Sequence, residues 1–286
     1  MIYLILSILF STSLFVIFKL FHKYEVDNVK AIVVNYAVAF VLGFLGSETK
    51  IPLTDIFDKP WLPGAFTLGF LFILIFVLMA KTSQINGVSV ASVASKMSVV
   101  IPVAFGVVVY NESVPFIKIL GILFALVAVY LVSVKREEIP MKDSLLLPLL
   151  LFLGSGIIDT TIKYIEVNFV HENEVSLFSG SLFGFAGFFG ALFLVSKGLD
   201  TVRNFEVKNV VAGIILGIPN YFSILFLIKA LQIKGLESSS LFTLNNVGIV
   251  LLSSIFGVVI FREVFSTKNY IGVLLAITSI VMIALA

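Results

Sequence analysis

Long apolar runs separated by short polar connections follow one another along the whole chain. A helix needs about 20 apolar residues to cross a hydrocarbon core of about 30 Å, whereas a barrel strand alternates apolar and polar residues over about ten. The runs therefore predict an all-α integral membrane protein. Its transmembrane helices are expected over 2–21, 29–46, 62–83, 88–110, 115–134, 144–165, 174–196, 208–231, 238–261 and 267–285.

Composition excludes several other classes of protein. Hydrophobic residues make up 59% of the chain and charged residues 13%, against roughly 45–50% and about 25% in soluble proteins. The net charge of +2 provides no basic field for nucleic acid. The first basic residue, Lys19, follows the first apolar run instead of preceding it, so this run is expected to be a transmembrane helix and not a signal peptide.

The sequence also lacks the residues that common enzymes use. It has no cysteine and two histidines, which leaves little for thiolate chemistry or a metal site. Phosphate-binding GxxxxGK, HExxH and GxSxG motifs are absent. We therefore predict that the protein is not an enzyme, with no catalytic residue, no metal site and no cofactor.

One stretch of sequence occurs twice. Residues 88–121 and 239–272 share an FGVV run, a glutamate that follows it (Glu112 and Glu263) and a later glycine (Gly121 and Gly272). A charged connector, 135–143, divides five predicted spans from five. We therefore predict two five-helix repeats, 1–134 and 144–286. Because each repeat crosses the membrane an odd number of times, the second must be inverted, an arrangement in which the substrate lies at the midplane in a central cavity.

Basic residues in the loops bear on orientation. The loops after the first, third, fifth, seventh and ninth spans carry the larger set, which favours a cytoplasmic position for these loops and both termini outside. This set is Lys23, Lys30, Lys81, Lys135, Arg136, Lys142, Lys197, Arg203, Lys208, Arg262 and Lys268.

Lys96 is the principal candidate for a functional residue. It lies near the centre of the fourth apolar run, where an uncompensated charge costs about 2.5–3.5 kcal/mol by insertion scales. Its ammonium could bind a carboxylate or phosphate of a substrate. Alternatively, Lys96 could pair with a carboxylate or with carbonyl groups at a helix end for a purely structural reason.

Asp159 and Lys163 form a second candidate, for a proton or charge switch. They are four residues apart and so share a helix face, where they can neutralise each other. Asp159 could take up and release a proton in a dry site. The alternative is a structural pair whose lysine extends toward the membrane surface.

Polar residues in spans 8 and 9 are candidates for orienting a substrate. Pro219 frees a backbone carbonyl and bends its helix beside Asn220 and Tyr221. Asn245 and Asn246 occupy the part of span 9 that corresponds to the surroundings of Lys96. Amide side chains also join membrane helices by hydrogen bonds, so a packing role stays open.

Other polar and small residues are expected to support the fold. Lys19 is expected to extend toward the membrane surface, and Glu112 and Glu263 to pair with helix ends or Arg262. The glycines are expected to form close helix–helix contacts. Among them are Gly180, Gly184 and Gly187 in one span and Gly213 and Gly217 in the next.

The doubled five-span unit, its FGVVVYNE and FGVVIFRE exits and the glycine near the start of each last span resemble the drug/metabolite transporter superfamily, specifically its EamA-like ten-helix members. The resemblance covers essentially the whole chain. It implies ten helices around a central cavity, alternating access, and export or exchange of small metabolites such as amino acids. Pro102 has Ser253 as its counterpart in the second repeat, so the two halves need not flex alike.

These observations lead to a multi-pass carrier of the bacterial cytoplasmic (inner) membrane. Its expected partners are the lipid bilayer, a small-molecule metabolite or drug, and protons as a coupling ion, with no nucleic acid. A sugar-phosphate or lipid-linked translocator is an alternative, which would need more basic residues in the cavity. A non-transporting scaffold or accessory subunit is another.

Overall fold

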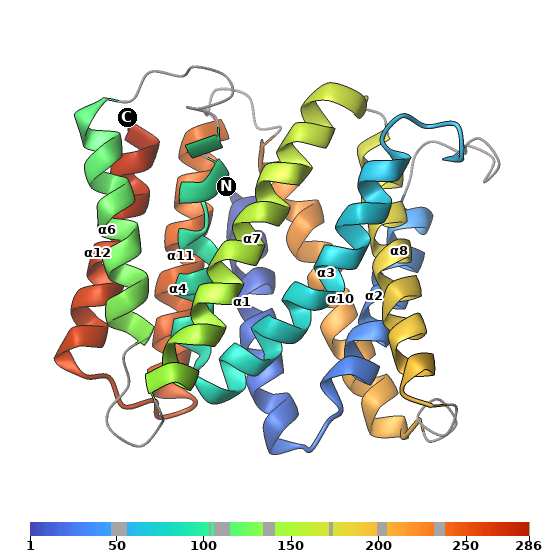
Figure 1. Cartoon of the computed structure of the whole chain (residues 1–286), viewed down its shortest axis with the longest axis horizontal. Coiled ribbons are helices and arrows are strands. Elements are labelled where there is room, and N and C mark those ends of the chain that lie inside the picture. Colours follow the sequence, from blue (N-terminus) through green and yellow to red (C-terminus); the bar gives the residue numbers. More distant parts are fainter. Residues whose placement is uncertain are drawn as a thin grey trace. The chain divides into compact units, whose positions relative to one another are not determined.

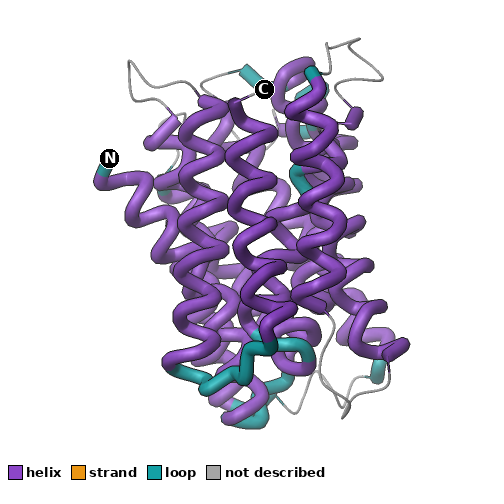
Figure 2. Tube along the Cα trace, turned by 90° about the vertical axis from the view of Figure 1, so that its left-hand side faces the viewer, coloured by secondary structure: helices purple, strands orange, loops and turns teal. Residues whose placement is uncertain are grey.

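The structure is a computed structural model that describes residues 1–46, 56–102, 104–105, 115–133, 141–171, 174–198, 205–231 and 238–285. All regular structure in these ranges is helical (Figures 1 and 2). The helices are α1 (Ile2–Lys23), α2 (Asn28–Leu45), α3 (Leu62–Ile85), α4 (Val88–Met97), α6 (Phe116–Ser133), α7 (Met141–Phe169), α8 (Val175–Ser196), α10 (Val207–Leu231), α11 (Ser238–Val259) and α12 (Thr267–Leu285).

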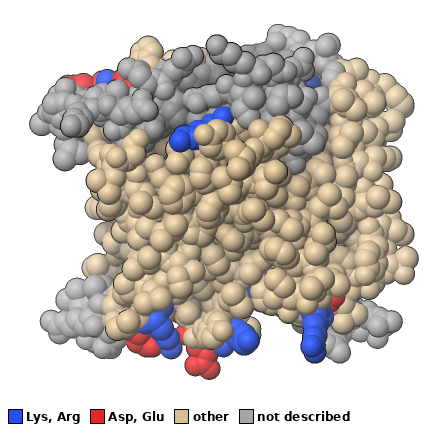
Figure 3. Space-filling view, turned by 180° about the vertical axis from the view of Figure 1, so that it is seen from behind, with Lys and Arg blue, Asp and Glu red and all other residues tan. Residues whose placement is uncertain are grey.

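Six of these helices contain a segment long and apolar enough to cross a membrane: α1, α2, α3, α7, α8 and α10. Shorter apolar helical segments cover Val88–Pro102, Phe116–Val132, Asn245–Val259 and Thr267–Ile283. On the face drawn in Figure 3, the described charged side chains lie toward the top and bottom of the view and uncharged side chains cover the stretch between them. The prediction of an all-helical membrane protein is thereby confirmed.

The packing of the chain defines two compact units. Unit 1 contains Met1–Leu20, Leu78–Ile157 and Phe222–Ala286, and unit 2 contains Phe21–Val77 and Ile158–Tyr221. Each unit takes segments from both predicted repeats, so these units follow packing and not sequence repetition. The division into repeats at 1–134 and 144–286 stays a prediction.

Small residues and side-chain hydrogen bonds join α6 to α12 in unit 1, where these two helices lie side by side (Figure 1). A Cβ on Gly272 would lie 2.6 Å from a methyl carbon of Val132, so the helices could not come so close with a larger residue there. Asn269 Nδ2 donates to the carbonyl oxygen of Val132 at 2.9 Å. At the other end of the contact, Ser279 Oγ donates to the carbonyl oxygen of Gly121 at 2.7 Å.

Close glycine contacts also organise unit 2. A Cβ on Gly43 of α2 would lie 3.1 Å from the Cα of Gly180 in α8. A Cβ on Gly213 of α10 would lie 2.6 Å from the carbonyl oxygen of Ala31 in α2. Without side chains at these positions, the backbones approach closely and gain van der Waals contact, which drives helix association in lipid. The predicted packing role of these glycines is confirmed.

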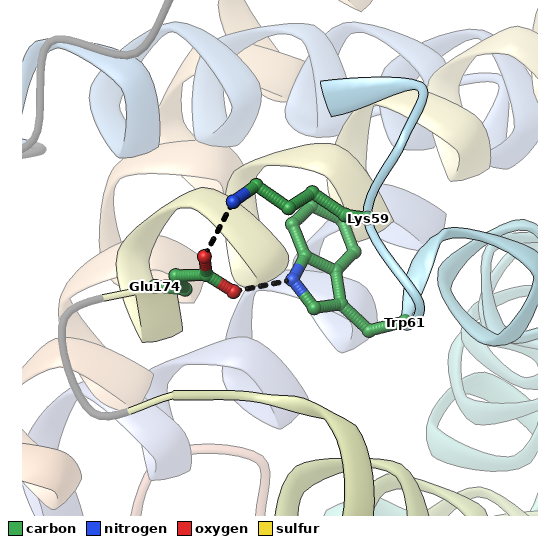
Figure 4. Close-up of polar contacts among 3 residues, drawn as sticks. All are labelled: Lys59, Trp61 and Glu174. Atoms are coloured by element: carbon green, nitrogen blue, oxygen red, sulfur yellow. Dashed lines mark hydrogen bonds and ion pairs between the residues drawn. The ribbon is translucent and has the colours of Figure 1, made fainter. Parts of the chain in front are cut away.

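A three-residue polar contact fixes the start of α3 to the start of α8 (Figure 4). Lys59 Nζ lies 2.7 Å from Glu174 Oε1, and Trp61 Nε1 donates to Glu174 Oε2 at 2.9 Å. Glu174 immediately precedes α8, where the helix dipole favours a negative charge. Burial alone would raise the pKa of Glu174, but the hydrogen bonds and the charge of Lys59 outweigh it and lower the pKa below its usual value.

We expect Glu174→Gln to lower the free energy of unfolding by about 1–3 kcal/mol at pH 7, because charge-assisted hydrogen bonds to Lys59 and Trp61 are lost. Since the folded-state pKa is lowered, this contribution is present above the unfolded-state pKa and disappears as the pH falls through the folded-state value. Thermal unfolding of both proteins in detergent, at pH 7 and below pH 4, measures this contribution of Glu174. Glu206→Gln is the matched control, because Glu206 pairs with Lys208 at 2.9 Å on the surface, where such pairs contribute little.

Candidate functional site

Lys96 lies at a break in the fourth span. The predicted span 88–110 is interrupted, because α4 ends at Met97 and Ser98 and Val99 form a turn before the chain becomes helical again. Pro102 has no N–H to donate to the carbonyl of Ser98. The amide of Ile101 donates to that carbonyl instead, at 2.9 Å, which tightens the turn.

The end of α4 is a favourable place for a cation. Lys96 is in the last turn of α4, where the aligned peptide dipoles leave a partial negative charge. The side chain is half-buried, and the neighbouring Ser95, Met97 and Ser98 are buried. The half-helix therefore provides part of the electrostatic compensation that a lysine within a membrane requires.

Contacts between α4 and α11 show which part of α11 faces this break. Ser253 Oγ donates a short hydrogen bond to Ser92 Oγ, and a Cβ on Gly257 would lie 2.6 Å from Ser89 Oγ. The two helices are therefore antiparallel. Farther along, Met97 and Val100 pack in one hydrophobic cluster with Val247 and Val250.

This register places Asn245 and Asn246 near the level of the break. Asn245 is 3% exposed, and its Oδ1 has no hydrogen-bond partner among the residues that the structure describes. Asn246 is half-buried. A buried acceptor without a donor costs about 1–3 kcal/mol. Asn245 and Asn246 of α11 therefore lie near the level of Lys96 along α4, and among the described residues the Oδ1 of Asn245 is a buried acceptor without a donor.

Serine side chains hold α4, the helix that contains Lys96, in place. Ser155 Oγ of α7 donates to Ser95 Oγ at 3.4 Å, and Ser98 Oγ donates to the carbonyl oxygen of Ser95 at 2.5 Å. The hydrogen bond from Ser155 ties α4 to α7, and the one between Ser253 and Ser92 ties α4 to α11, whereas the one from Ser98 stays within the end of α4. Small hydroxyl residues allow such close approach of membrane helices.

Glu263 holds the other end of α4. Its Oε1 accepts from the amide of Val88 at 2.8 Å, and its Oε2 accepts from Ser89 Oγ at 3.3 Å. The carboxylate thus replaces the missing side-chain cap of α4, whose preceding residue is Gly87 at φ +111°. A Cβ on Gly87 would lie 2.6 Å from Glu263 Oε1. The predicted pairing of Glu263 with a helix end is confirmed; Glu112 lies outside the described residues.

Lys19 is also held by a backbone carbonyl. Its Nζ donates to the carbonyl oxygen of Gln84 at 2.9 Å, and Gln84 Nε2 donates to the carbonyl oxygen of Phe18 at 3.0 Å. This reciprocal contact joins the end of α1 to the end of α3. Lys19 therefore has a structural contact within unit 1, where the sequence predicted only an extension toward the membrane surface.

The remaining predicted site residues belong to unit 2. Asp159 is exposed on α7, whereas the side chain of Lys163 lies outside the described part of the structure, so their ion pair stays a prediction. Asn220 is 2% exposed beside Pro219 in α10. Tyr221 is half-buried. Its hydroxyl oxygen lies close to Gly46, where an added Cβ would be only 2.5 Å from it.

Asn35 is a polar residue of unit 2 that the sequence analysis missed. It lies inside α2, it is completely buried, and its Oδ1 has no hydrogen-bond partner among the described residues. Its backbone carbonyl lies against α10, 2.8 Å from where a Cβ on Gly217 would be. The signal in the sequence was a single amide within the second apolar run, where a polar side chain is costly unless it is paired.

Comparison with known proteins agrees with this reading of the chain. Residues 1–134 match the sequence profile of the EamA-like transporter family. An uncharacterized protein of Haemophilus influenzae is 27% identical over an alignment of 285 positions, which spans 97% of this chain and 95% of the relative. A protein of known crystal structure superimposes with a TM-score of 0.60 and 13% identity, over 98% of this chain and 94% of the other; this likeness concerns the fold alone.

The resemblance seen in the sequence and the family match point to the same family. The apolar helices of the structure suit a protein that spans the membrane. The protein is a multi-pass membrane protein, and its residues 1–134 are similar to the EamA-like transporter family.

Proposed function

We propose that the protein is a secondary transporter that moves a small polar or amphipathic metabolite, such as an amino acid, by alternating access. Ten transmembrane helices would form two inverted five-helix repeats around a central cavity. The family match to a transporter supports carriage of a small molecule across the bilayer. The relative in Haemophilus influenzae supports a bacterial cytoplasmic membrane as the location.

The observation that carries this proposal is the broken fourth span. The half-helix α4 ends at Met97 with Lys96 in its last turn, and near the same level lies the Oδ1 of Asn245, which has no hydrogen-bond partner among the described residues. Interrupted helices supply the binding groups in many secondary transporters, because their free ends and polar side chains face a cavity. In our proposal the Lys96 ammonium binds the anionic end of the substrate, and Asn245 accepts a hydrogen bond from a substrate N–H.

Two further roles belong to the same proposal. Asn246, Asn220 and Tyr221 would orient the rest of the substrate. Asp159 and Lys163 would form a switchable charge pair that couples transport to protons, because a proton on Asp159 ends its attraction for Lys163. A substrate with both an anionic group and N–H donors suits Lys96 and Asn245 together.

Uptake of amino acids into proteoliposomes, measured with and without a pH gradient, tests the role of Lys96. We expect Lys96→Gln to reduce uptake at least tenfold, since a loss of about 1.4 kcal/mol of binding free energy already has that effect. Lys96→Arg should retain part of the activity because it keeps the positive charge. Lys197→Gln, a change at an exposed lysine after α8, should leave uptake unchanged. Normal uptake by well-folded Lys96→Gln protein would remove Lys96 from the mechanism.

Asn245→Leu tests the second contact. We expect it to reduce uptake at least tenfold yet to lower the free energy of unfolding by less than about 1 kcal/mol, because the Asn245 oxygen accepts no hydrogen bond from the described residues. The matched control is Asn269→Leu on α12, whose amide makes hydrogen bonds to Ser266 and Val132. That change should lower the free energy of unfolding by about 1–3 kcal/mol and leave uptake per folded molecule unchanged. The reverse pattern would show that Asn245 has only a packing role.

A further inference from the structure

A groove on unit 1, formed by α11, the loop after it and α12, has no occupant in the described part of the chain. Its volume is about 410 Å³, and apolar side chains form most of its lining. Leu251 and Ile255 of α11 are 42% and 53% exposed, and Leu274 of α12 is 64% exposed. The groove is therefore a concave apolar surface that faces away from the core of unit 1.

The length of the groove matches one leaflet of a bilayer. Its lining on α11 runs from Leu251 to Val259, close to the loop between the two helices. Nine helical residues rise about 12 Å, and half of a hydrocarbon core is about 15 Å thick. A groove of this length along a membrane helix can hold one acyl chain from the interface to near the midplane.

The open end of the groove has the chemistry of a membrane interface with positive charge. Arg262 and Lys268 are exposed in and just after the loop between α11 and α12, and no ion pair joins either of them to another residue in the described ranges. The acidic neighbour, Glu263, is directed to α4. The ring of Tyr270 packs edge-on against that of Phe265, with 5.2 Å between the ring centroids, and tyrosine is enriched at the headgroup level of membranes.

One polar atom also lies in the groove lining. Ser254 is 8% exposed, and its Oγ has no hydrogen-bond partner among the described residues. It is about one and a half turns of helix below Val259. The ester carbonyl of a phospholipid lies a short distance below its phosphate, so it is an acceptor within reach of this depth.

We propose that the groove between α11 and α12 binds an acyl chain of an anionic phospholipid, with the lipid phosphate held by Arg262 and Lys268. A neutral or zwitterionic lipid would fill the same apolar surface but would gain less from the two cations. This selects an anionic lipid over other lipids at one place on the protein. The proposal does not depend on the transport function.

Quenching of tryptophan fluorescence by brominated lipids tests the proposal. Tyr270→Trp places a reporter at the mouth of the groove, and the native Trp61 is completely buried and contributes a constant background. The protein is reconstituted in phosphatidylcholine vesicles that contain increasing fractions of phosphatidylglycerol, with bromine on the acyl chains of one lipid at a time. We expect a preference for phosphatidylglycerol of about fivefold for each basic side chain that contacts it.

Matched variants distinguish this site from general attraction to the membrane. Leu126→Trp reports on α6, where the side chain is 47% exposed away from the groove, and should show no preference. Arg262→Gln with Lys268→Gln should abolish the preference at Tyr270→Trp, whereas Lys197→Gln should retain it. Equal preference at both reporters, or a preference that survives neutralisation of Arg262 and Lys268, would overturn the proposal. So would the absence of quenching by either lipid, which would indicate that a second copy of the chain covers the groove.

Discussion

The lack of water in the bilayer core is the constraint on which the structure depends. Every backbone amide and carbonyl there must find a partner within the protein, which limits membrane spans to helices or closed barrels. Where the hydrogen bonds of a helix stop, its terminal amides and carbonyls need other partners. At the break after α4, the amide of Ile101 satisfies the carbonyl of Ser98. At the start of α4, the carboxylate of Glu263 satisfies the amide of Val88.

These two contacts hold α4 at both of its ends. It is a half-helix whose N-terminus is held by a side chain from beyond the end of α11 and whose serines bond to α7 and α11. Lys96 is consequently fixed on a short, well-supported element and not on a loop. Precise positioning of this kind is what a binding site needs, and it explains why we place the proposed substrate contact there.

Much of the fold followed from local sequence. The apolar runs predicted every described helix, because hydrophobic length is a property of neighbouring residues. The spacing of glycines along a helix is also a local property of the sequence, and it predicted close packing at these positions. Contacts such as Gly43 with Gly180 confirm this. Candidate site residues were less accessible to such reasoning. Asn35 looked like an ordinary residue of the second run, and nothing in its neighbouring sequence indicates that its oxygen is buried with no partner in the described part of the chain.

The sequence by itself determined that this is a helical membrane protein with a lysine near the centre of its fourth apolar run and with a first half that matches the EamA-like transporter family. Only the tertiary structure decided which polar groups have partners. Glu263 and Val88 are 175 positions apart, and Lys19 and Gln84 are 65 apart. Whether a buried polar atom is satisfied depends on such distant neighbours, whereas the cost of burying it depends only on its own chemistry. The same holds for the lipid groove, whose apolar residues became notable once packing had left them uncovered.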